Sequence, residues 1–152
     1  MSELTMSAAE NTGGRPWHLW LFGVLAVLWN CMGALDYVMT QTKNQTYMSQ
    51  FTQEKLDYFY SIPTWAVATW AIAVWGGLLG SVLLVIGLKV SRWIFLVSLI
   101  SLSITFFQNY VLTNGLEIMG DAFSIIFTAL IVIVAIALLW YSFALTKQGI
   151  LR

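Results

Sequence analysis

Four long stretches of this chain contain no aspartate, glutamate, lysine or arginine, and this pattern limits the fold more than any other feature. They hold 20, 31, 24 and 25 residues and lie at 16–35, 58–88, 93–116 and 122–146. A helix needs about 20 apolar residues to cross a hydrocarbon core about 30 Å thick. The pattern therefore predicts four transmembrane helices, at 17–39, 64–88, 93–112 and 122–145.

The composition excludes a water-soluble domain. Only 9% of the 152 residues are charged and 59% are hydrophobic, whereas a soluble domain has about 25% charged residues. An open sheet would leave its edge amides without partners in lipid, and a barrel requires short alternating strands that this chain lacks. We expect an all-α integral membrane four-helix bundle over 17–145, with cytoplasmic tails at 1–16 (flexible) and 146–152.

Lysine and arginine placement predicts the orientation. If the N-terminus is inside, the two outer loops contain only Lys43 and Lys55. The cytoplasmic segments then contain the other five basic residues, Arg15, Lys89, Arg92, Lys147 and Arg152. Basic residues concentrate on the cytoplasmic side of membrane proteins. Both termini are therefore expected in the cytoplasm.

The first outer loop, 41–63, is the only long connection, and it carries the signature of a short amphipathic helix. Thr52 is suited to cap that helix, and Phe51 and Leu56 occupy the positions of a hydrophobic staple. Leu56, Phe59 and Tyr60 share its apolar face. The helix is either a lid over the bundle or a turn whose apolar face lies in lipid, and the second interpretation is favoured.

Polar residues inside two predicted spans mark a candidate site. Asn30 and Asp36 lie in the first span, and Thr105 and Gln108 continue a stripe that begins at Ser98 in the third. Intramembrane polar residues are costly and usually functional, so Asn30, Asp36, Thr105 and Gln108 are candidates for one polar cluster. The alternative for the stripe is hydrogen bonding between helices. Asp36 is either a proton or cation site or an ordinary interfacial helix end.

The second span contains a face of small residues, which are Gly76, Gly77, Gly80 and Ser81. Small residues four apart allow two helix backbones to approach closely. We expect this face to pack against another helix, either within the bundle or across a dimer.

Enzyme chemistry has little support in the sequence. His18 is the only histidine and Cys31 the only cysteine, so they do not complete a metal-ligand set. No catalytic triad or phosphate-binding loop is recognisable. The net charge is zero, without the basic tract that nucleic-acid binding requires. We expect no catalytic residue, no cofactor, no metal and no nucleic-acid partner.

Several motifs resemble those of a family of small, uncharacterised proteobacterial inner-membrane proteins with four helices. They include Arg15-Pro16-Trp17-His18, Asp36-Tyr37-Val38-Met39-Thr40, Pro63-Thr64-Trp65-Ala66 and Trp75-Gly76-Gly77. The resemblance covers about residues 15–112. Members are sometimes labelled sugar transporters, so the resemblance implies a bacterial inner-membrane location and transport, with no mechanism or functional residues to carry over.

Two functions are expected from these features. The first is a transporter or channel component for a small polar solute such as a sugar, with a pathway lined by the polar cluster at a homo-oligomer interface. The second is a non-transporting accessory, assembly or envelope-stress protein that binds a membrane-protein partner through its small-residue face. In both cases the lipid bilayer is the surrounding medium.

Overall fold

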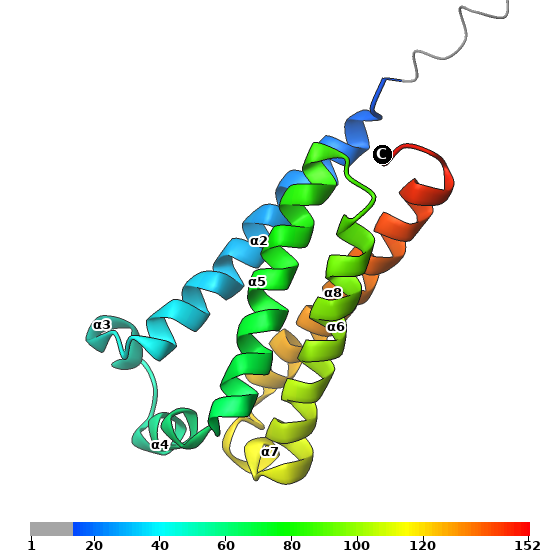
Figure 1. Cartoon of the computed structure of the whole chain (residues 1–152). Coiled ribbons are helices and arrows are strands. Elements are labelled where there is room, and N and C mark those ends of the chain that lie inside the picture. Colours follow the sequence, from blue (N-terminus) through cyan, green and yellow to red (C-terminus); the bar gives the residue numbers. More distant parts are fainter. Residues whose placement is uncertain (1–13) are drawn as a thin grey trace, which may run out of the picture.

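The computed structural model describes residues 14–152 and contains four long antiparallel helices (Figure 1). They are α2 (Trp17–Gln41), α5 (Thr64–Ile86), α6 (Ser91–Phe107) and α8 (Ala122–Lys147). A π-helical turn, η1 (Gln108–Leu112), continues α6. Each of the four is long and apolar enough to cross a membrane, and the part of the chain that is described contains no strand. The prediction of an all-α four-helix membrane protein is confirmed.

The predicted span boundaries agree with the observed helices to within about two residues. α2 begins at Trp17 and α8 at Ala122, as predicted. The second span ends at Ile86, two residues early, because Gly87 adopts a left-handed conformation with φ of 86° that closes the helix. The third span begins at Ser91 and its regular α-helix ends at Phe107.

Helix α5 is the centre of the bundle, with α2 on one side and α6 on the other (Figure 1). Helix α8 packs against α6 and reaches α2 through aromatic contacts such as that of Tyr141 with Phe22. None of the residues in the most apolar stretch of α8 is buried within the protein. The fourth helix is therefore the member most open to lipid, as its composition indicates.

Short helices cover the end of the bundle opposite to the C-terminus (Figure 1). They are α3 (Gln45–Met48), α4 (Gln53–Ser61) and α7 (Gly115–Ile118). The predicted amphipathic helix is α4, and the Thr52 hydroxyl caps it by accepting a hydrogen bond from the Lys55 amide. The buried side chain of α4 is Tyr58, however, while Tyr60 on the predicted apolar face is exposed.

The opposite end of the bundle is closed by the last residues of the chain. Leu151 is 5% exposed and packs with Leu19, Leu84, Phe95 and Leu145. The Arg152 amide donates to the Gly87 oxygen over 2.9 Å, and the Lys89 amide donates to the Arg152 oxygen over 2.7 Å. The predicted tail 146–152 is thus folded onto the bundle, because burial of Leu151 offsets the cost of ordering it. Of the predicted tail 1–16, residues 1–13 lie outside the described part of the chain.

Candidate functional site

The four residues predicted to form one polar cluster lie at separate places. Asn30 and Asp36 are in α2, Thr105 is in α6 and Gln108 is in η1. Helix α5 lies between α2 and α6 (Figure 1) and provides hydrogen-bond partners for both Asn30 and Thr105. The predicted cluster does not form. Asn30, Asp36 and Thr105 each contact a different partner, and Gln108 lines a pocket.

Asn30 joins α2 to α5. Its side-chain amide donates to the Ser81 hydroxyl over 3.0 Å and to the Ala26 oxygen over 2.9 Å. Ser81 is fully buried and in turn donates to the Gly77 oxygen over 2.8 Å. This contact is a packing interaction between two spans.

Thr105 belongs to a similar set of contacts between α5 and α6. Its hydroxyl lies 2.9 Å from that of Thr69, and it donates to the Ser101 oxygen over 3.0 Å. Ser98 lies on the same face of α6, seven residues before Thr105, and its hydroxyl donates to the Ala73 oxygen of α5 over 2.6 Å. The interpretation of this stripe as interhelical hydrogen bonding holds for Ser98 and Thr105.

Asp36 joins the last turns of α2 to the short helix α3. Its carboxylate accepts a hydrogen bond of 2.5 Å from the Tyr47 hydroxyl in α3. Burial of the phenol, and then the hydrogen bond and charge of Asp36, raise the pKa of Tyr47 above its ordinary value. The pair connects α3 to the span.

The small-residue face of α5 is used within the bundle, on both sides of the helix. Added Cβ atoms at Gly76 and Gly80 would lie 3.2 Å from Ser98 Cβ and 2.8 Å from the Phe95 ring in α6. A Cβ at Gly77 would collide with Asn30 Oδ1 in α2, and Ser81 bonds the same residue. The dimer alternative for this face is therefore not supported, since α2 and α6 already occupy it.

Gln108 is different from the other three residues, because it is buried beside a pocket. Its side chain is 3% exposed, and its Oε1 atom has no hydrogen-bond partner among residues 14–152. Buried polar atoms are nearly always hydrogen-bonded, so an unpartnered one at a pocket wall requires an explanation.

The pocket has a volume of about 360 Å³ and lies where α4 and the start of α5 meet η1. Helix α4 and the turn after it form one wall, and η1 with the residue after it forms the other. Trp65, the second residue of α5, lies between them in the sequence and also lines the pocket. The lining residues are Tyr58, Ser61, Ile62, Pro63, Trp65, Gln108, Leu112 and Thr113. None of them carries a formal charge at neutral pH.

The π-helical turn explains how this wall is built. A π turn shifts the backbone register and is frequent at functional sites. Beyond it, the Thr113 hydroxyl donates to the Asn109 oxygen over 2.8 Å. The Tyr58 hydroxyl donates to the same oxygen over 3.3 Å and lies 3.2 Å from the Thr113 hydroxyl. Residues of α4 and η1 are thereby joined at the edge of the pocket.

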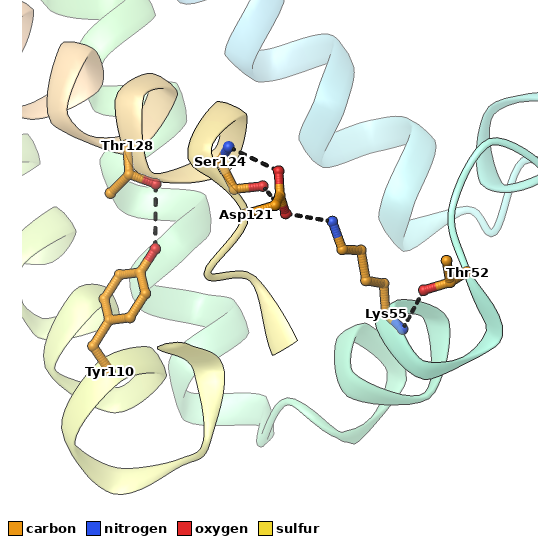
Figure 2. A network of polar contacts seen from close by, with 6 residues as sticks. All are labelled: Thr52, Lys55, Tyr110, Asp121, Ser124 and Thr128. Atoms are coloured by element: carbon orange, nitrogen blue, oxygen red, sulfur yellow. Dashed lines mark hydrogen bonds and ion pairs between the residues drawn. The ribbon is translucent and has the colours of Figure 1, made fainter. Parts of the chain in front are cut away.

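A second contact ties α4 to the start of α8. Lys55 Nζ lies 2.7 Å from Asp121 Oδ1, and Asp121 caps α8 by accepting from the Ser124 amide and hydroxyl (Figure 2). The hydrogen bonds from Lys55 and then Ser124 lower the pKa of Asp121 to about 2. Tyr110 of η1 and Thr128 of α8 also pair, over 3.2 Å (Figure 2). Helix α4 is thus attached to η1 through Tyr58 and to the start of α8 through Lys55, and it covers this end of the bundle as a cap.

Chemically, the pocket is suited to binding an uncharged molecule. It offers one buried oxygen acceptor, several hydroxyl groups and apolar or aromatic walls, which is the usual make-up of small-molecule sites. Within 14–152, no three His, Cys, Asp or Glu side chains are grouped so that they hold a metal ion.

Comparisons with protein families, with curated proteins and with solved structures found no match to this chain.

Sequence reasoning missed most of the pocket. Tyr58 has no role assigned from the sequence, and Trp65 is named only within a motif of the family resemblance. One sequence feature that points to this region is the Asn114-Gly115 turn, whose glycine lies beside the pocket residue Tyr58. A Cβ at Gly115 would collide with the Asn109 oxygen and lie 2.8 Å from the Tyr58 hydroxyl, so glycine allows this close approach.

Proposed function

We propose that this small multi-pass membrane protein is a transporter or channel component for a small polar solute such as a sugar. The observation that carries the proposal is the unpartnered oxygen of Gln108 beside a pocket at one end of the bundle. A solute that donates a hydrogen bond there would satisfy an atom that the protein leaves without a partner. The role is non-catalytic and requires no cofactor.

The proposed location is the bacterial inner membrane, with both termini in the cytoplasm. The resemblance to small proteobacterial inner-membrane proteins supports the location. The end of the bundle where Arg152 bonds Gly87 and Lys89 also carries Arg15 and Arg92. A cytoplasmic position for this basic end follows the usual distribution of lysine and arginine. The pocket then faces the outer side.

Helix α5 packs closely against both α2 and α6. Because four helices make a narrow bundle, we place the pathway at the interface of a homo-oligomer. The native mass of the protein extracted directly into lipid nanodiscs tests this step. A homodimer or larger ring supports it, and a monomer contradicts it.

Solute flux into proteoliposomes tests the function itself. Gln108→Leu is expected to reduce the uptake of a neutral polar solute about 10-fold, since it removes the acceptor without adding charge. Ser103→Ala is the matched control, because Ser103 is exposed on α6 and bonds only its own helix at Leu99. Equal uptake by the wild type and by empty vesicles would reject the proposal.

The alternative is a non-transporting accessory, assembly or envelope-stress protein. Its expected partner surface, the small-residue face, is buried by α2 and α6, so a partner would need the outer helices instead. If these short helices bind the partner, deletion of 51–60 is expected to release it. A partner that still co-purifies with the deletion variant would contradict the accessory function.

A further inference from the structure

We infer that the pocket beside Gln108 selects an uncharged, hydroxyl-bearing solute and discriminates against both cations and anions. This inference rests on the proposed function and adds to it the place of binding and the chemical class of the ligand. It comes from the polar groups, the walls and the volume of the pocket.

The first argument is the hydrogen-bonding requirement of Gln108. Its carbonyl oxygen is buried and lacks a donor among the described residues. The same amide also carries two N–H groups, so it can accept from and donate to one ligand at the same time. A hydroxyl group, which is both donor and acceptor, matches a primary amide better than an ammonium or a carboxylate does.

The second argument is electrostatic. The polar lining groups are the Gln108 amide and the hydroxyls of Tyr58, Ser61 and Thr113. Burial raises the pKa of Tyr58 above its ordinary value, which keeps the phenol neutral. Lys55 and Asp121 form an ion pair with each other, and neither of them lines the pocket. A charged ligand in this pocket would meet no opposite charge among the lining residues.

The third argument concerns size and shape. A volume of about 360 Å³ lies at the lower end of the range for small-molecule pockets, which is about 300–1,000 Å³. The walls at Ile62, Pro63, Trp65 and Leu112 are apolar or aromatic. These surfaces suit the C–H face of a ring whose edge carries hydroxyl groups. A pocket of this volume accommodates a compact ring or a short chain.

The test is equilibrium binding to the full chain in nanodiscs, with three probes that share one ring. They are myo-inositol, which is neutral, myo-inositol monophosphate, which is anionic, and scyllo-inosamine, which is cationic. We expect myo-inositol to bind at least about 10-fold more tightly than either charged probe. No binding of myo-inositol up to about 10 mM, or equal binding of all three, would overturn the inference.

Variants test whether Gln108 is responsible. Gln108→Leu is expected to weaken myo-inositol binding about 10-fold, whereas Ser103→Ala leaves it unchanged. Gln108→Glu keeps the shape but introduces a carboxylate, and it is expected to shift the preference toward the cationic probe. Trp65→Leu, at a residue that is 48% exposed, provides a variant outside the core and is expected to weaken binding severalfold. Unchanged affinity and probe preference in both Gln108 variants would contradict the inference.

The two proposals fail in different ways. Binding that depends on Gln108 without any flux in proteoliposomes would reject the transport function and leave the site in place. Flux of a neutral solute that is indifferent to Gln108 would reject the site and leave transport in place.

Discussion

The Tyr58 hydroxyl of α4 donates a hydrogen bond to the backbone oxygen of Asn109, 51 positions later in the chain, over 3.3 Å. This oxygen lies in the π-helical turn and also accepts from Thr113. The contact joins α4 to the third span at the edge of the pocket. The position of α4 over the pocket therefore depends on a buried residue of the cap itself.

Removal of this hydroxyl is expected to loosen α4. Tyr58→Phe keeps the ring but loses the bond to Asn109, at a cost of about 1 kcal/mol. Tyr60→Phe is the matched control, because Tyr60 is 43% exposed. Hydrogen–deuterium exchange of the α4 amides measures the effect. Faster exchange in the Tyr58 variant alone is expected, and equal exchange in both variants would mean that the hydroxyl does not hold the cap.

The close approach of α2 and α5 depends on glycine at position 77. A Cβ there would collide with Asn30 Oδ1 and displace the side chain that bonds Ser81. Gly77→Ala is expected to lower the free energy of unfolding by about 1–3 kcal/mol. Unfolding in detergent or in nanodiscs measures it.

Gly33→Ala is the control for this prediction, because nothing lies within 4 Å of a Cβ at Gly33. Alanine favours a helix over glycine by about 1 kcal/mol, so this variant is expected to be as stable as the wild type or more so. If both alanine variants gained stability, the packing of α2 on α5 would be looser than described.

The ion pair between Lys55 and Asp121 predicts a pH dependence at the start of α8. The carboxyl of Asp121 has a pKa lowered from 3.8 to about 2 in the folded protein. A lowered folded-state pKa means that the contribution to stability is present above about pH 4 and is lost as the pH falls toward 2. Because the pair is exposed to solvent, its effect on overall stability is small.

Carboxyl NMR titration of Asp121 measures this effect directly. Lys55→Met is expected to raise the pKa of Asp121 toward its ordinary value, although the hydrogen bonds from Ser124 still lower it. Lys43→Met is the control, since Lys43 lies over the Tyr60 ring, 4.4 Å from its centre. An identical Asp121 titration in the Lys55 variant and in the wild type would show that the pair does not form in solution.

The contact of Tyr47 with Asp36 predicts an unusual tyrosine titration. Burial is the largest cause of the raised pKa of Tyr47, and the hydrogen bond and charge of Asp36 add to it. Asp36→Asn removes the charge, so we expect Tyr47 to ionise at a lower pH than in the wild type but still above 10.0. Ultraviolet titration, with Tyr47→Phe to identify the signal, measures the shift. No change in the Tyr47 signal would place Asp36 away from the phenol.

Local patterns in the sequence were sufficient to predict the four spans and the short helix α4. The absence of charge over 20 residues or more is a local property, and so is the capping of α4 by Thr52. Each follows from the cost of leaving polar groups in lipid or helix-end amides without partners. The first residues of α2 and α8 and the existence of α4 could accordingly be predicted, whereas both spans end two residues later than predicted.

The neighbours of each polar side chain were decided only by the tertiary structure. Periodicity shows that Asn30 and Thr105 lie on helix faces, but which helix they meet depends on the order and rotation of the spans in the bundle. With α5 at the centre, Asn30 meets Ser81 and Thr105 meets Thr69, while Gln108 is left at the pocket. The role of Tyr58 could not be predicted for the same reason. Its hydroxyl contacts the Asn109 oxygen of η1 at a place where Gly115 allows a close approach of the backbone. Hydropathy is a property of consecutive residues, so it can be read from the sequence. A binding pocket is formed by residues that are distant in sequence, so only the tertiary structure brings them together.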